Sequence, residues 1–133
     1  MNETPIQITG NLTADPELRH TNGGRAVTSL RVAANPRRYD RNSGQWVDGQ
    51  TNYFDVEVWA GPENLAESLS RGDRVIIFGN LRTQAWTPES ADKSRTKLVV
   101  VAAEVGISLR YATAKPVKTA RVEDAPDADE ESF

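Results

Sequence analysis

Stretches in which apolar and polar residues alternate recur between residues 6 and 105 of the chain. Five of them are rich in Val, Ile, Thr and aromatic residues and are bounded by Gly, Pro, Asn or Asp: residues 6–13, 27–33, 51–60, 75–86 and 96–105. A period of two between such boundaries is typical of strands that bury one face. The sequence therefore predicts at least five β-strands.

The segment between the third and fourth predicted strands carries helical signals instead. Pro62 and Glu63 stand at its start. Leu65 and Leu69 are four residues apart, and Gly72 follows them. Apolar residues at this spacing share one face of a helix, Pro is favoured at the first helical position, and Gly is favoured just after the last. We predict a short amphipathic helix with Gly72 at its C-cap.

Two further segments are too polar for core strands. Residues 35–50 are predicted to form a long hairpin arm, and residues 87–97 a second projecting loop. One helix between the third and fourth of five strands, with long loops after the second and fourth, is the order of an OB-fold. A β-sandwich, the alternative, usually has about seven strands. We predict an all-β fold: a five-stranded OB-fold barrel with one short helix and long β-hairpin loops.

Composition narrows the possible chemistry. The chain has no Cys and one His, which excludes thiolate zinc sites, iron–sulfur clusters, disulfides and thiol nucleophiles. We expect no cofactor and no metal. The longest apolar run is residues 98–103, far shorter than the roughly 20 residues that span a bilayer, and the first residues lack the pattern of a signal peptide. We expect a cytoplasmic protein with no membrane contact.

Charge divides the chain into two parts. Residues 1–112 hold thirteen basic and thirteen acidic residues, whereas residues 113–122 hold three basic residues and residues 123–133 hold six acidic ones. A segment so poor in apolar residues cannot bury enough surface to offset the entropy of ordering. We predict a folded domain at residues 1–112 and a disordered tail at 113–133, basic and then acidic. Such a tail either improves solubility or docks a partner through its last residue, Phe133.

Strand alternation also predicts an aromatic outer face. The outer positions of the third strand are Tyr53, Asp55, Glu57 and Trp59, and those at the end of the fourth are Arg82, Gln84 and Trp86. The predicted arm adds Tyr39 and Trp46, interleaved with Arg37, Arg38 and Arg41. Unpaired bases stack on such rings regardless of base identity while Arg contacts the phosphates. The alternative is that Trp59 and Trp86 fill a barrel end or a subunit interface.

Two other classes of function have to be weighed. Asp55 and Glu57 share a strand face roughly 7 Å apart, within reach of carboxylate-pair catalysis. However, no partnering acid, nucleophile elbow or phosphate loop accompanies them in the sequence, so we expect the protein not to be an enzyme. An OB-fold module that binds a protein partner is the second alternative, and the neutral domain favours it slightly.

Seven short segments together carry a resemblance to a known family. They are GNL at 10–12, DPELR at 15–19, NGG at 22–24, AV at 26–27, QTNYF at 50–54, LSRGDRV at 69–75 and GNLRTQAW at 79–86. In this order and spacing they resemble the bacterial single-stranded-DNA-binding proteins over residues 5 to about 112. Residues 106–115 look like the extra strand or hook that follows the last strand in actinobacterial members, where it helps to clamp a tetramer.

The resemblance implies a function and a site. It implies sequence-independent binding of single-stranded DNA by a homotetramer of OB-folds in replication, recombination or repair, in association with the nucleoid. Base stacking falls to Tyr53, Trp86 and Trp59, and on the arm to Tyr39 or Arg38. Basic contacts fall to Arg41 and Arg71, which join Arg82 from the outer face.

The sequence also departs from the family in its charges. Basic residues that the family often carries are replaced here by Asp55, by Gln84 and Ala85, and by the acidic N-terminal segment. For single strands the salt slope is roughly −0.7 per neutralised phosphate, so we predict weaker and less salt-sensitive binding than is usual for the family. The tail ends in Asp129, Glu130, Glu131, Ser132 and Phe133. It keeps the acids and terminal Phe through which relatives recruit replication and repair proteins, and is shorter, which suggests a specialised paralogue.

Overall fold

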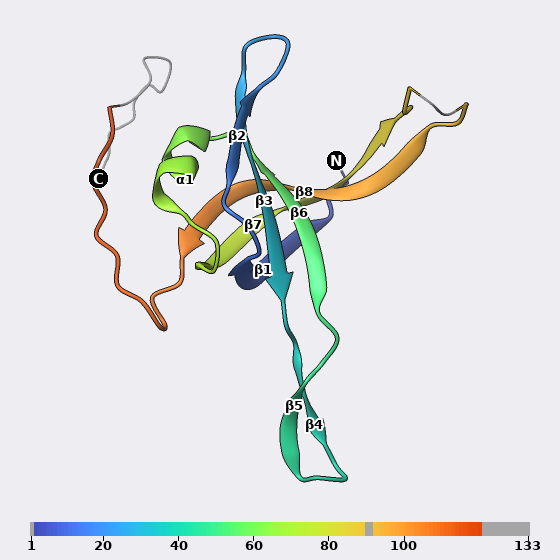
Figure 1. The fold of residues 1–133 in the computed structure, drawn as a ribbon, viewed down its shortest axis with the longest axis vertical. Helices are drawn as coiled ribbons and strands as arrows, with labels where there is room; N and C mark the ends of the chain where they lie inside the picture. Colours follow the sequence, from blue (N-terminus) through green and yellow to red (C-terminus); the bar gives the residue numbers. More distant parts are fainter. Residues whose placement is uncertain (1, 90–91, 121–133) are drawn as a thin grey trace.

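The protein forms a small closed β-barrel from which β-hairpins project (Figure 1). The computed structural model describes residues 2–89 and 92–120. Its elements in chain order are β1 (Pro5–Leu12), β2 (Glu17–His20), β3 (Ala26–Ala34), β4 (Arg37–Asp40), β5 (Gln45–Asp48), β6 (Asn52–Val58), α1 (Pro62–Ser68), β7 (Arg74–Trp86) and β8 (Arg95–Ile107). The main sheet has the order β1-β7-β8-β6-β3-β2, and an additional β1–β3 pairing closes a ring of five strands. This confirms the predicted all-β OB-fold.

The five predicted strands are the five strands of the ring. β1, β3, β6, β7 and β8 agree with the predicted ranges to within two residues at each end. β2 was not predicted, because all four of its residues are exposed and it therefore shows no alternation. It pairs with β3 through a hairpin whose turn contains Gly24 at φ 88°, within the Asn-Gly-Gly segment at residues 22–24.

Branched apolar side chains fill the barrel. Val32, Val56, Val75 and Ile77 are fully buried and belong to one cluster that includes residues from every strand of the ring. Two glycines let strands approach closely: a Cβ on Gly79 would overlap the Val101 carbonyl oxygen, and one on Gly10 would overlap that of Ala33. The tight core fixes which face of each strand points outward.

The helix ends earlier than the sequence predicts. α1 spans Pro62–Ser68, and its C-cap is Leu69 in an extended conformation, so the expected C-cap role of Gly72 is wrong. Leu69 is only 6% exposed and belongs to the core cluster, so the chain leaves the helix to bury this side chain. Gly72, at φ 93°, serves the following turn, where its N–H donates to the Leu12 carbonyl.

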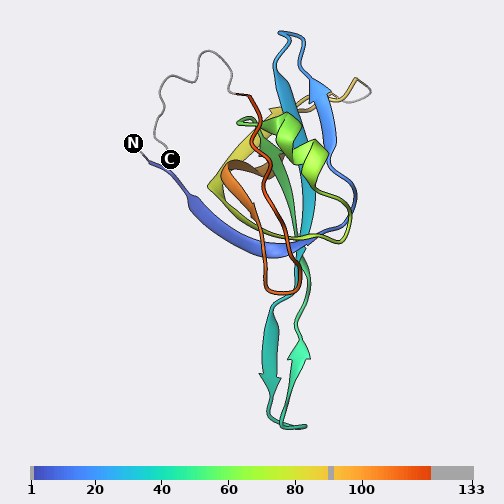
Figure 2. The same ribbon diagram turned by 90° about the vertical axis from the view of Figure 1, so that its left-hand side faces the viewer.

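Two arms and a hook extend from the barrel. β4 and β5 form the predicted arm at residues 35–50 as a separate two-stranded sheet. The second arm is the far end of the β7–β8 ladder, which continues to the Trp86–Arg95 pair and leaves a shorter loop than predicted. After β8 the chain turns back on itself, and residues 108–120 contain no helix or strand (Figure 2). No helix in the described ranges is long and apolar enough to cross a bilayer.

Candidate nucleic-acid interface

One continuous outer face runs over β2, β3, β6, β8 and β7. Directly opposite residues of paired strands point to the same side of a sheet. The ladder pairs Arg31 of β3 with Asp55 of β6, and Gln84 of β7 with Lys97 of β8. β6 and β8 run parallel side by side, which joins the two halves. The alternation that the sequence predicts for β6 and β7 therefore places their outer residues on a shared surface, which we call the strand face. Its residues on these two strands are Tyr53, Asp55, Glu57, Arg82, Gln84 and Trp86.

Tyr53 and Trp86 are the open rings of the strand face. Tyr53 is 56% exposed near the start of β6, and Trp86 is 44% exposed at the end of β7. The guanidinium carbon of Arg31 lies 5.1 Å from the centre of the Tyr53 ring, within the range of a cation–π contact. Rings this exposed can each accept a base on a free surface.

Trp59, which directly follows β6, is held more firmly. Its indole Nε1 donates to Glu57 Oε1 at 3.3 Å, and the Arg25 guanidinium lies 4.7 Å from the ring centre. The residue is half-buried. One side of this ring therefore carries a cation from the β2–β3 hairpin, so a base would stack on the other side or displace Arg25.

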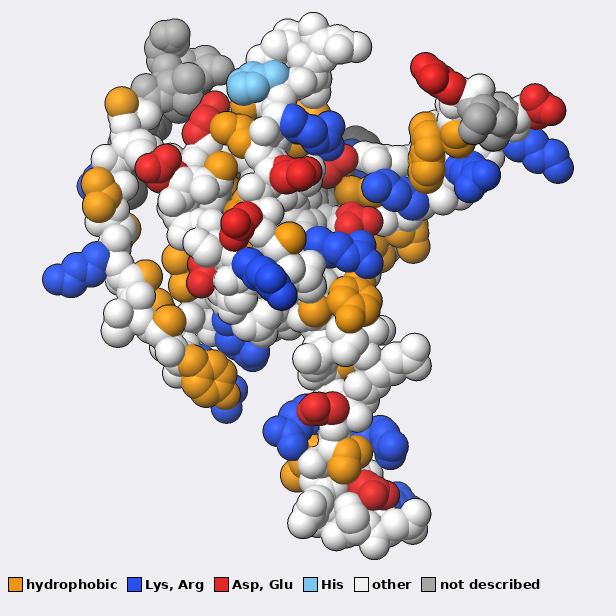
Figure 3. Space-filling model, in the orientation of Figure 1, with side chains coloured by type: hydrophobic (Ala, Val, Ile, Leu, Met, Phe, Trp, Pro, Cys, Tyr) orange, Lys and Arg blue, Asp and Glu red, His pale blue; other side chains and the backbone are white. Residues whose placement is uncertain are grey.

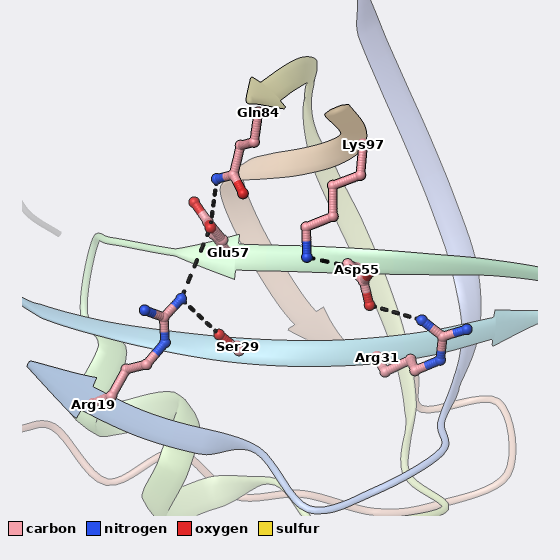
Figure 4. A network of polar contacts seen from close by, with 7 residues as sticks. All are labelled: Arg19, Ser29, Arg31, Asp55, Glu57, Gln84 and Lys97. Carbon is pink, nitrogen blue, oxygen red and sulfur yellow. Dashed lines mark hydrogen bonds and ion pairs between the residues drawn. The ribbon is translucent and has the colours of Figure 1, made fainter. Parts of the chain in front are cut away.

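The two carboxylates of β6 are surrounded by donors from neighbouring strands (Figure 4). Asp55 lies 2.8 Å from an Arg31 nitrogen and 3.9 Å from the Lys97 ammonium. Glu57 accepts a hydrogen bond from Gln84 Nε2 at 2.7 Å and lies 3.9 Å from Arg19. The negative charges at the centre of the strand face are thus partly neutralised by cations of the same face.

The β4–β5 arm presents a second aromatic and basic surface. Tyr39 and Trp46 lie opposite each other, with ring centres 5.7 Å apart and planes at 73°, and are 51% and 61% exposed. Arg38 on β4 and Arg41 in the turn that follows are exposed. Figure 3 shows Lys and Arg side chains beside hydrophobic ones on both arms. This arm has the residue types that stack bases and contact phosphates.

A shallow pocket lies on the other arm. It is lined by Gln84, Ala85, Trp86 and Lys97 and has a volume of about 340 Å³. This is at the lower end of the roughly 300–1,000 Å³ typical of ligand pockets. The pocket is thus lined by both an open indole and a lysine.

Most predicted site residues share the strand face or the first arm. Tyr53, Trp59, Trp86 and Arg82 belong to the strand face, and Tyr39, Arg38 and Arg41 to the β4–β5 arm. Arg82 also lies 3.8 Å from Glu3. Arg71 is exposed in the turn between α1 and β7, at the opposite end of β7 from Trp86, and its N–H donates to Asp15. The tail residues Asp129, Glu130, Glu131 and Phe133 lie outside the described residues.

Sequence reasoning missed several cations of the strand face. Four basic side chains contact residues of this face: Arg31, Lys97, Arg19 and Arg25. Arg31 and Lys97 stand at outer positions of predicted strands, so alternation alone contained a signal for them. Their partners depend on the register between strands, which no single strand pattern carries.

The chain is similar in sequence to known proteins. Residues 3–108 match the single-strand binding protein family. The chain is 49% identical over 120 residues to a single-stranded DNA-binding protein of Mycobacterium leprae, covering 90% of this chain and 71% of the relative. It is 47% identical over 118 residues to single-stranded DNA-binding protein 2 of Streptomyces coelicolor, covering 88% of this chain and 59% of the relative.

A solved structure shares the fold as well. The crystal structure of a small single-stranded DNA-binding protein from Streptomyces coelicolor has a TM-score of 0.67 and 33% sequence identity, covering 82% of this chain and 97% of that one. The family match at residues 3–108 extends over the strands that make the strand face. The chain belongs to the single-strand binding protein family.

Proposed function

We propose that the protein binds single-stranded DNA without regard to sequence and protects it during replication, recombination or repair. The observation that carries this proposal is the strand face, where the open rings of Tyr53 and Trp86 share one surface with Arg31 and Lys97. Membership of the single-strand binding protein family supports it independently. Trp59 and the arm residue Tyr39 extend the stacking surface, and Arg38, Arg41, Arg71 and Arg82 supply further phosphate contacts.

Independence of sequence follows from the kind of contact. Every base has a π-face, and stacking on an aromatic side chain contributes about 1–3 kcal/mol per base whatever its identity. Phosphate contacts carry no sequence information. A surface of rings and cations therefore binds any strand whose bases are unpaired, and it excludes duplexes because their bases are already stacked.

Titration with oligo-dT tests this proposal. Trp fluorescence is expected to be quenched as bases stack, and Trp86→Ala is expected to weaken binding while a duplex of the same length binds poorly. Absence of quenching in both proteins, together with no shift in anisotropy of a labelled oligo-dT, would favour a protein-interaction module instead. Oligo-rU in parallel measures the preference for DNA over RNA.

We further propose that the domain works as a homotetramer. Large apolar side chains are exposed where β8 ends and the hook begins: Ile107 at 37%, Leu109 at 63% and Tyr111 at 76%. Such a group of exposed apolar residues is typical of an interaction surface. Sedimentation equilibrium is expected to give the mass of four chains, and a monomer at micromolar concentration would contradict the proposal.

The remaining proposals concern the tail, the location and the absence of catalysis. We propose that residues 1–112 fold alone and that the tail, through Asp129, Glu130, Glu131 and Phe133, recruits replication and repair proteins to nucleoid DNA in the cytoplasm. Deleting residues 123–133 is expected to abolish partner recruitment while DNA binding persists.

We propose no enzymatic activity, since Asp55 and Glu57 are both engaged by donors of the strand face.

A further inference from the structure

Asp55 holds two cations on the surface proposed to bind DNA. Its Oδ1 lies 2.8 Å from Arg31 Nη1 across the β3–β6 ladder, and its Oδ2 lies 3.9 Å from Lys97 Nζ on β8. The three side chains are 39–51% exposed, so an approaching ligand can reach all of them. In Figure 4 the two cations converge on this carboxylate from opposite sides.

The neighbouring carboxylate has a different environment. The Glu57 side chain is only 13% exposed and accepts hydrogen bonds from Gln84 at 2.7 Å and from Trp59 at 3.3 Å. These donors are neutral, and the cation paired with Glu57, Arg19, is 3.9 Å away. Glu57 therefore orients Trp59 and Gln84. Asp55 instead pairs with Arg31 and Lys97, two cations that could otherwise contact DNA phosphates.

We propose that Asp55 is an internal competitor of the DNA phosphates. The proposal rests on the proposed function, single-stranded DNA binding at the strand face. In the free protein the carboxylate holds Arg31 and Lys97, and in the complex a phosphate takes their N–H donors in its place. The location suits this exchange, because Arg31 also lies over the Tyr53 ring and Lys97 lines the pocket with Trp86. Phosphates that link bases stacked on these rings pass beside both cations.

The exchange has a consequence for salt dependence. Carboxylates and phosphates both accept charge-assisted hydrogen bonds from Arg and Lys, so they compete for the same donors. Each phosphate that a protein neutralises on a single strand contributes roughly −0.7 to the slope of log K against log salt concentration. A cation already paired with Asp55 adds less net positive charge to the surface. Asp55 thus lowers both the affinity and the salt dependence of binding.

The test is the substitution Asp55→Asn in the full chain, with binding to oligo-dT measured over a range of salt concentrations. Asn has the same shape but no charge. We expect several-fold tighter binding at low salt and a slope steeper by about 0.7 to 1.4, corresponding to one or two additional phosphates. A thermal melt verifies folding, and Asp55→Ser serves if the Asn variant does not fold.

Glu67→Gln is the matched control, because it removes the same charge from the exposed surface of α1. If only net charge mattered, Asp55→Asn and Glu67→Gln would change the affinity and the salt slope of oligo-dT binding equally. That result would overturn the proposal. Lys97→Gln supplies a second measurement: it should cost more affinity in the Asp55→Asn background than in the wild type, and equal costs would also overturn it. If the wild type itself fails to bind oligo-dT, the proposed function fails; if it binds and only these differences are absent, the role of Asp55 alone is wrong.

Discussion

The barrel, in which all neighbouring strands except β6 and β8 are antiparallel, and the antiparallel β4–β5 arm use their side chains in opposite ways. In the barrel, alternate residues such as Val56, Val75 and Ile77 are fully buried. On the arm, three of the four β4 residues are exposed, and the half-exposed rings of Tyr39 and Trp46 contact each other edge to face. Burial of apolar area is the main source of stability, so the barrel determines whether the chain folds. The arm contributes little to folding, and its side chains are free to serve binding.

The largest expected effect is the loss of folding stability caused by a cavity in the barrel. Ile77→Ala removes a fully buried side chain of β7 from the core cluster. The free energy of unfolding is expected to fall by about 2–5 kcal/mol, through lost burial and an unfilled cavity. Denaturant titration measures it. Ile77→Val is the control, with an expected loss of about 0.5–1.5 kcal/mol. A loss below 1 kcal/mol for the Ala variant would contradict a tightly packed barrel.

Loss of an exposed ring should weaken DNA binding and leave folding stability nearly unchanged. Trp86→Ala is expected to reduce the free energy of oligo-dT binding by about 1–3 kcal/mol, because one stacking contact is lost. The free energy of unfolding should change little, since the side chain is 44% exposed. Calorimetry and denaturant titration on the same sample separate the two quantities. Destabilisation comparable to that of Ile77→Ala would mean that the ring is structural.

A single buried hydrogen bond offers a finer comparison. Thr28 is fully buried, and its Oγ1 donates to the Pro62 carbonyl at 2.6 Å, which joins β3 to the start of α1. Thr28→Val keeps the shape and removes the donor, so the free energy of unfolding should fall by about 1 kcal/mol. The same substitution on an arm, at exposed Thr96, should leave stability unchanged. Equal effects at both positions would remove the distinction between barrel and arm.

How much the sequence predicts follows from the same distinction. Strands of the barrel bury one face, so β1, β3, β6, β7 and β8 are visible as alternation, and the outer positions of Tyr53 and Trp86 follow from it. β2 is exposed throughout and leaves no such pattern. The end of α1 was predicted wrongly because Leu69 is buried by tertiary packing, which overrides the local Gly72 signal. The contacts of Asp55 with Arg31 and Lys97 depend on the pairing of three strands, which local patterns do not determine.

The smallest expected effect is a difference in the salt slope of DNA binding between variants of two neighbouring arginines of the arm. Successive residues of a strand point to opposite faces. Arg37 donates to the Trp46 carbonyl at 3.1 Å and lies 3.9 Å from Asp48, so its guanidinium is engaged within the arm. Arg38 is exposed on the other face. Arg38→Gln is therefore expected to make the salt slope of oligo-dT binding less negative by about 0.7, the contribution of one phosphate.

Arg37→Gln, which removes the same charge one residue away, should leave that slope nearly unchanged. Both variants should keep the free energy of unfolding within about 0.5 kcal/mol of the wild type, because surface substitutions and exposed ion pairs contribute little. Equal slope changes in the two variants would show that the arm attracts DNA only through its total charge. A change confined to Arg38 would place a phosphate beside Arg38, and would show that the contacts of Arg37 with Trp46 and Asp48 keep its guanidinium from the DNA.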